Sequence, residues 1–298
     1  MDNQGKHPFP ISEYCVIFVD LLGHKKFLQD LSTCAPDEAQ RRVSELSEPL
    51  RRFKDGVRER VAEAKDATRD AIRHAPVSVN QPNLLKAVDD VTTGVQQFSD
   101  STLLYVKMGN PVSFIVLLMM IEFIAFRMLD DAGRGFLLRG GIAVGKGWEV
   151  DNNCLCGQVV ADAYNLESKV SNWGRITTSE LFLTRLNGIC ELARHCYGCW
   201  CAELLRPMLL LVQKDIDGML FIDYLNPIVG ELYEREHFGS DWFFERCEEG
   251  YKFINSQLER FRSTANKNHE CSRLALRYDI MRGYWKSRLA MWTNIAKR

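Results

Sequence analysis

The chain of 298 residues is 46% hydrophobic, and its 38 Lys and Arg residues almost balance its 39 Asp and Glu residues. The near-zero net charge argues against a nucleic-acid-binding domain, which usually carries a large basic excess, and the apolar content argues against a disordered chain. The length allows one large domain or two small ones and is ample for a buried core, and we expect one domain over residues 1–298.

The chain begins with a strand pattern followed by a long helical pattern. Residues 14–22 (YCVIFVDLL) are rich in β-branched and aromatic side chains, which predicts a buried strand that ends at Asp20. Apolar residues recur every three or four positions over residues 37–74, which predicts an amphipathic stripe that Pro49 breaks into two helices. Residues 75–83 contain two prolines and are expected to form a loop.

Two further strands and an apolar helix follow. Residues 92–108 predict a strand pair joined by a tight turn at Ser99-Asp100-Ser101. Residues 112–129 predict a helix that is apolar but contains Glu122 and Arg127, and it is too short to span a bilayer comfortably. We therefore expect a buried core helix and no membrane partner.

The second half of the chain is mixed before it becomes helical. We expect a helix over residues 162–170 and a hairpin within residues 207–225, with its turn at Asp217-Gly218. Residues 239–298 are expected to be mostly helical. Further strands are expected over residues 135–145, 154–160 and 174–183.

The order strand, helix, strand, strand, helix, strand predicts the split βαβ of a ferredoxin-like, α+β fold. We expect a core over about residues 13–225 with a mixed or antiparallel sheet, a helical insertion at 37–74 and a C-terminal helical segment at 239–298. In this topology the third strand lies between the first two, which run parallel. The turn that carries Asp100 then lies beside the end of the strand that carries Asp20, eighty residues earlier.

Two carboxylates at one end of a sheet repel each other unless something neutralises them. Mg²⁺ or Mn²⁺ does so and also bridges to phosphate oxygens. The strand-to-helix turn at residues 21–27 (LLGHKKF) offers backbone N–H groups to phosphates, and Lys25 and Lys26 add positive charge. The structural alternative is that Asp20 caps a helix and that Asp100 is a turn residue.

Four segments, in order, resemble motifs of the class III nucleotidyl cyclases. VIFVDLLGHKKF and QQFSDSTLLYV resemble the family's two metal motifs, RGGIAVG the strand before its dimer arm, and GQVVADAYNLES its helix motif. The resemblance covers roughly residues 13–180. It implies a ferredoxin-like catalytic core and a head-to-tail homodimer with composite sites at the interface.

The resemblance also implies a reaction. Asp20 and Asp100 would bind two Mg²⁺ or Mn²⁺ ions, with the Leu21 carbonyl as a further ligand. The ribose 3′-hydroxyl of a nucleoside triphosphate would attack the α-phosphorus in line, and pyrophosphate would leave. The phosphates would lie against the turn formed by Leu22, Gly23, His24 and Lys25.

The base-reading positions depart from those of the purine cyclases. The Lys and the acidic residue that read adenine in adenylate cyclases fall at Gln96 and Cys154. This loss, the single compact domain and the helical insertion resemble the pyrimidine cyclases of bacterial Pycsar antiphage systems, whose cyclic UMP or cyclic CMP activates a separate effector protein. The resemblance implies UTP, or less favourably CTP, as substrate. The alternatives are an adenylate or guanylate cyclase with unusual base contacts, and an inactive cyclase-like domain that binds nucleotide and regulates a partner.

The two residues that stabilise the transition state in this family are also replaced here. The family's Asn and Arg fall at Ala161 and Asn165. Arg139, Lys169 and Arg175 are candidates to supply positive charge instead, and we include Arg139 among the catalytic residues. For each of these three cations the competing interpretation is a solvated surface residue.

The ten cysteines do not resemble a secreted disulfide framework, because the chain is long and begins with a polar segment. We expect reduced thiols in a cytoplasmic protein. Cys196 and Cys199 have zinc-like spacing, with Cys190, His195 and Cys201 nearby. A second Cys-x-x-Cys pair is missing from the sequence, so thiols are favoured over a zinc site.

Overall fold

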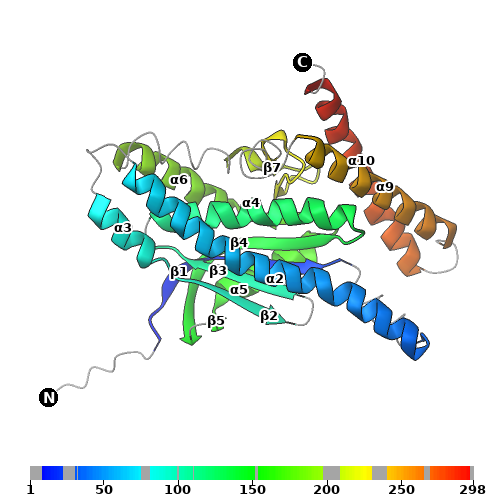
Figure 1. The fold of residues 1–298 in the computed structure, drawn as a ribbon, viewed down its shortest axis with the longest axis horizontal. Helices are drawn as coiled ribbons and strands as arrows, with labels where there is room; N and C mark the ends of the chain where they lie inside the picture. Colours follow the sequence, from blue (N-terminus) through cyan, green and yellow to red (C-terminus); the bar gives the residue numbers. More distant parts are fainter. Residues whose placement is uncertain are drawn as a thin grey trace.

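The computed structural model describes residues 9–22, 31, 33–74, 81–98, 101–109, 111–151, 154–196, 209–229, 240–264 and 269–295. The fold is α+β, with helices packed on an eight-stranded mixed sheet (Figure 1). The strands are β1 (Ser12–Leu21), β2 (Thr93–Phe98), β3 (Ser101–Lys107), β4 (Leu138–Asp151), β5 (Cys154–Cys156), β6 (Ile176–Thr178), β7 (Val212–Lys214) and β8 (Leu220–Ile222). The helices are α2 (Pro36–Arg73), α3 (Gln81–Asp89), α4 (Pro111–Gly133), α5 (Gln158–Asn165), the π-helical turn η1 (Leu166–Val170), α6 (Glu180–Cys196), α9 (Ser240–Thr264) and α10 (His269–Ile295).

The strand order is β2-β3-β1-β4-β6-β8-β7, with β5 paired to β4. Strand β1 runs antiparallel to both β3 and β4, and β3 runs antiparallel to β2. Strands β1 and β2 are therefore parallel and separated by β3, as the sequence predicts for a ferredoxin-like topology. The pairing of β4 with β6 is parallel, which makes the sheet mixed.

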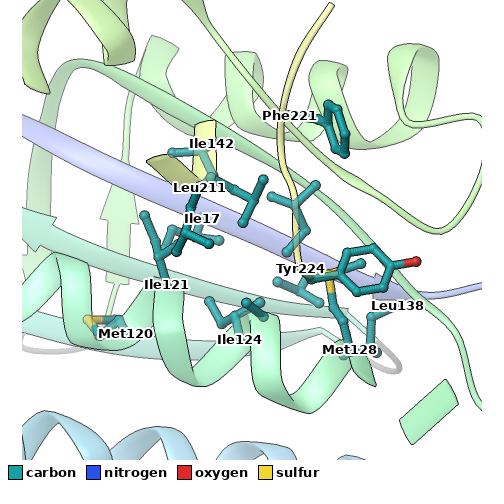
Figure 2. Packing of buried hydrophobic residues seen from close by; sticks show 14 of the residues in the cluster. Ile17, Met120, Ile121, Ile124, Met128, Leu138, Ile142, Leu211, Phe221 and Tyr224 are labelled. Atoms are coloured by element: carbon teal, nitrogen blue, oxygen red, sulfur yellow. The ribbon is translucent and has the colours of Figure 1, made fainter. Parts of the chain in front are cut away.

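The two faces of the sheet bury different clusters. Ile17 of β1 lies in the larger cluster with Ile121 of α4, on the face that α4 and α2 cover (Figures 1 and 2). Val16 and Phe18 lie in the smaller cluster, which α5 covers. Because side chains alternate along a strand, Asp20 belongs to the α5 face of the sheet.

Helix α4 is a core helix, as predicted. It is the one helix in the described part of the chain that is long and apolar enough to cross a membrane, and 78% of its apolar window is buried inside the protein. Met120 and Ile124 on α4 pack under the strands (Figure 2). This burial is what the core helix of a soluble protein shows.

The predicted break at Pro49 is wrong, because α2 is one continuous helix from Pro36 to Arg73. A proline inside a helix costs roughly 3 kcal/mol. Phe53 and Val57, one and two turns later, are buried, and the Phe53 ring lies 6.2 Å from that of Phe123 on α4. Each such buried side chain contributes about 1.5–3 kcal/mol, so the packed stripe offsets the cost of the proline.

Two other predicted boundaries are wrong for local reasons. Helix α3 begins inside the expected loop 75–83, and Pro82 is tolerated there because the first N–H groups of a helix have no intrahelical partner. The strand expected over residues 154–160 ends at Cys156. Gly157 turns the chain with a φ of 130°, and α5 begins at the next residue.

Helix α6 was not predicted, since its first residues were assigned to a strand over residues 174–183. That strand ends at Thr178. The next residue, Ser179, caps the helix: its Oγ accepts a hydrogen bond from the N–H of Phe182 at 3.2 Å. A serine in this position satisfies an N–H group that a helix start leaves unpaired.

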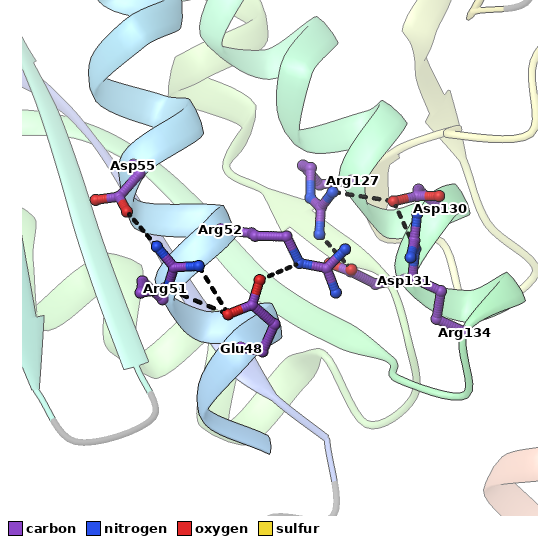
Figure 3. A network of polar contacts seen from close by, with 8 residues as sticks. All are labelled: Glu48, Arg51, Arg52, Asp55, Arg127, Asp130, Asp131 and Arg134. Atoms are coloured by element: carbon purple, nitrogen blue, oxygen red, sulfur yellow. Dashed lines mark hydrogen bonds and ion pairs between the residues drawn. The ribbon is translucent and has the colours of Figure 1, made fainter. Parts of the chain in front are cut away.

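A buried set of ion pairs lies on α4, beside a second set on α2 (Figure 3). Arg127 pairs with Asp130 at 3.0 Å and also with Asp131, and all three residues are less than a tenth exposed. Arg134 donates to Asp130 at 3.1 Å, while Arg52 of α2 adds positive charge near Asp131. Burial raises the pKa of Asp131 to about 6, against the opposing effect of Arg127.

Asp131→Asn should therefore remove a pH dependence of stability. The unfolded carboxyl titrates near the ordinary pKa of about 3.9, so the folded protein holds this proton more tightly. The free energy of unfolding of the wild type should fall, relative to that of the variant, as pH rises from about 4 to about 6. Urea unfolding of both proteins across this range measures the difference. A wild type that gains relative stability would show that the ion pair with Arg127 outweighs burial.

Candidate functional site

Asp20 is held between its two neighbouring strands. On β3, Ser101 Oγ donates a hydrogen bond to Asp20 Oδ1 at 2.8 Å. On β4, Arg139 is paired with Asp20 in the strand register and donates to Oδ2 from Nη2 at 2.8 Å and from Nε at 3.2 Å. The start of β3 therefore lies beside the end of β1, in agreement with the predicted topology. Asp100, which precedes Ser101, lies outside the described residues.

A second carboxylate contacts the same arginine. Glu167 Oε1 lies 2.8 Å from Arg139 Nε, and Glu167 is only 2% exposed. Glu167 belongs to η1, and π-helical turns are rare and frequently lie at functional sites. Arg139 is thus clamped between Asp20 and Glu167 and is not a solvated surface cation. Glu167 is not among the predicted site residues, although it lies inside the helix motif GQVVADAYNLES.

A glycine on β4 allows this contact. A Cβ on Gly141 would lie 2.2 Å from the carbonyl oxygen of Ala163, 2.6 Å from Leu166 Cβ and 2.8 Å from the Glu167 nitrogen. Two of these atoms belong to the backbone and cannot give way. Gly141 therefore lets α5 and η1 approach β4 closely enough for Glu167 to reach Arg139.

The two expected base-reading residues lie at different ends of the sheet. Gln96 on β2 is 9% exposed and pairs with Leu103 on β3, so it shares the face of Asp20. It lies two strands away from Asp20, a lateral distance of roughly 10 Å. Cys154 pairs with Asp151 on the part of β4 that extends past the start of β1. Within one chain, Cys154 is therefore not brought to the Asp20 end.

Arg175 proves to be structural. It is 1% exposed, pairs with Asp215, donates to Asp217 Oδ1 at 3.1 Å and lies 5.2 Å above the ring of Trp173. The hydrogen bond from Arg175 lowers the pKa of Asp217. The β7–β8 hairpin turns at Gly218, which has a φ of 82°, so the turn prediction is confirmed. Arg175 fastens this turn to the sheet and is not available as a catalytic cation.

The other expected charge-supplying positions line a different surface. Asn165 and Lys169, together with Asp162 and Ser179, line a cavity of about 420 Å³ between α5, η1 and the start of α6. Ala161 is exposed on α5. The hydrogen bonds of Asp20 described above run to Ser101 and Arg139 instead.

Part of the predicted site lies outside the described residues. Leu21 ends β1 and is buried, and Leu22 follows it, whereas Gly23, His24 and Lys25 are not described. Cys199 and Cys201 of the zinc-like cluster are not described either, nor are the side chains of His195 and Cys196, while Cys190 is buried in α6. Among the side chains that are described, three or more metal-ligating residues do not gather anywhere, so thiols in place of zinc stay a prediction.

Comparison of the chain with models of known protein families gives no match, and comparison with curated proteins finds no similar sequence. The chemistry of the site is therefore inferred from its geometry. A carboxylate at a strand end, a hydroxyl and a clamped guanidinium can together hold a cation and a phosphate group.

Gly141→Ala should break the contact that places Glu167. The added Cβ pushes η1 off β4, and overpacking of this kind costs about 1–3 kcal/mol of unfolding free energy. Gly188→Ala is the control, because Gly188 lies in α6 with open space around it, and the change should be neutral or slightly stabilising. Urea unfolding measures both variants. A Gly141→Ala protein as stable as the wild type would contradict the close approach described here.

Proposed function

We propose that the protein is a class III nucleotidyl cyclase that converts UTP, less favourably CTP, into the 3′,5′-cyclic nucleotide and pyrophosphate. The observation that carries the proposal is the position of Asp20. It lies at the end of β1, hydrogen-bonded to Ser101 directly after the second expected metal ligand, Asp100.

The site is suited to Mg²⁺ or Mn²⁺ once Arg139 releases its ion pair with Asp20. Asp20 offers hard carboxylate oxygens, and two N–H groups of Arg139 contact its Oδ2. A divalent cation therefore competes with Arg139 for Asp20. Glu167 gives Arg139 a second partner, so the guanidinium stays compensated when it leaves Asp20. When bound, two metal ions would neutralise the triphosphate and activate the ribose 3′-hydroxyl.

The chain's own residues would then orient the reaction. The 3′-oxygen forms a bond to the α-phosphorus while the bond from that phosphorus to the β-bridging oxygen breaks, and the hydroxyl proton passes to solvent. Pyrophosphate leaves with the electron pair. Arg139, at the edge of the site, would stabilise the charge that develops on the leaving group.

The proposal includes a head-to-tail homodimer and a cytoplasmic role in antiviral signalling through a separate effector. The extension of β4 beyond β1 supports association, because Trp148 and Val150 on it are 36% and 46% exposed. Apolar side chains on a projecting hairpin are typical of contact surfaces. A partner subunit would also bring Gln96 and Cys154 to a site that one chain leaves incomplete.

Incubation of the protein with Mn²⁺ and each of the four nucleoside triphosphates should yield cyclic UMP as the main product in mass spectrometry. Asp20→Ala and Asp100→Ala should each abolish the product without lowering the melting temperature by more than a few degrees. Asp279→Ala is the control, because that carboxylate is 39% exposed on α10 and pairs with Arg262 and Arg282.

The outcomes separate the alternatives. Cyclic AMP or cyclic GMP as the sole product would overturn the pyrimidine assignment. Activity retained in Asp20→Ala would overturn the metal assignment. Nucleotide binding without any cyclic product would favour an inactive, regulatory cyclase-like domain, which the residues at positions 161 and 165 already suggest.

Arg139→Gln should tighten Mn²⁺ binding in the absence of nucleotide by about tenfold, because it removes the positive charge that competes for Asp20. Arg139→Lys keeps the charge and should bind Mn²⁺ about as the wild type does. Isothermal titration calorimetry measures the three proteins, with melting temperatures as the folding control. Equal affinity in all three would show that Arg139 does not compete with the cation.

A further inference from the structure

Arginines from β4 and α10 gather at the Asp20 end of the sheet. Met281 of α10 packs on Gly174: a Cβ there would lie 2.9 Å from Met281 Cε and 3.5 Å from the carbonyl oxygen of Leu138. This turn of α10 therefore lies beside the start of β4, where Arg139 follows Leu138. Arg277 is one helical turn before Met281 and on the same face of α10.

Two arginines of this helix, Arg273 and Arg277, lack a compensating charge among the described residues. Neither Arg277 nor Arg273 has an ion-pair or hydrogen-bond partner among the residues that the structure describes, whereas Arg282 on the same helix pairs with Asp279 at 2.6 Å. Arg277 is half-buried, and burial together with the positive charges of Arg273 and Arg139 lowers its pKa. Like charges held together in a partly buried position are unfavourable until an anion neutralises them.

We propose that Arg277, with Arg273 beside it, binds the polyphosphate group of the nucleotide at the Asp20 site. The inference rests on the proposed function in taking this anion to be a nucleoside triphosphate. Guanidinium groups hold phosphate oxygens through paired, charge-assisted hydrogen bonds. The C-terminal helix then supplies the positive charge that Ala161 and Asn165 do not.

In this proposal, α10 carries phosphate-binding arginines to the site. Helix α10 lies outside the ferredoxin-like core, yet Met281 and Arg277 bring it to the end of the sheet where Arg139 contacts Asp20. Anion binding would relieve the repulsion between Arg277 and its neighbours. Substrate would thereby draw α10 and β4 together at the site.

Calorimetric titration of the full-length protein with inorganic tripolyphosphate, without metal, tests the proposal. Arg277→Gln should weaken binding about tenfold, and Arg277→Lys should weaken it less, since it keeps the charge but loses the forked geometry. Lys286→Gln is the matched control. It removes the same charge from the same helix, about two and a half turns away and on the opposite face, and should change binding less than about twofold.

Arg277→Gln should also melt at the same temperature as the wild type or higher, because it removes a like-charge repulsion. Unchanged tripolyphosphate binding, or an equal loss in Lys286→Gln, would overturn the proposal. A protein that unfolds on Arg277→Gln would contradict the absence of compensation, and Arg273→Gln would then measure the anion site. Tripolyphosphate bound through Arg277 without any cyclic product would overturn the cyclase proposal alone. Cyclic product with an unchanged kcat/KM in Arg277→Gln would overturn this inference alone.

Discussion

The ion chain from Asp20 through Arg139 to Glu167 connects the elements that form the site. It joins β1, β4 and η1, three segments far apart in the sequence, through N–O distances of 2.8 Å. Each partner is at least four-fifths buried, and a buried charge is costly unless it is paired. Gly141 makes the pairing of Glu167 with Arg139 possible, because it lets α5 and η1 approach β4 closely.

The ion pairs of Arg139 with Asp20 and Glu167 suggest a metal-free and a metal-bound state of the site. In the structure, Arg139 contacts both carboxylates at once. In the proposed metal-bound state it would keep Glu167 and release Asp20, so that the site changes its counter-charge without leaving a buried group unpaired. The arginines of α10 would then face the substrate's phosphates beside a guanidinium that is still held in place.

Contacts remote from Asp20 hold α10, and with it Arg273 and Arg277, in place. Tyr284 donates a hydrogen bond to the buried Asp223 at 2.6 Å, and Trp285 donates to the hydroxyl of Tyr224 at 3.1 Å. Both acceptors directly follow β8, so α10 is fastened to the far strands of the sheet. Trp285 is fully buried, so it packs in the core between α10 and the sheet's far strands.

Sequence patterns predicted what depends on local periodicity. The apolar run that ends at Asp20, the β2–β3 pair and the apolar helix predict the strand order, and that order predicts that the segment around Asp100 lies beside Asp20. The hydrogen bond from the next residue, Ser101, to Asp20 agrees with this prediction. Properties that depend on tertiary contacts were missed. Helix α2 continues past Pro49 because its apolar stripe packs on α4, which lies far along the chain. Glu167 reaches Arg139 only because η1 packs closely on β4.

The most direct test of the central claim is a crystal structure with Mn²⁺ and an unreactive UTP analogue. The account predicts anomalous density for Mn²⁺ at Asp20, with Arg139 turned away from it and still paired to Glu167. Mn²⁺ bound elsewhere, with the Asp20–Arg139 pair intact, would contradict it.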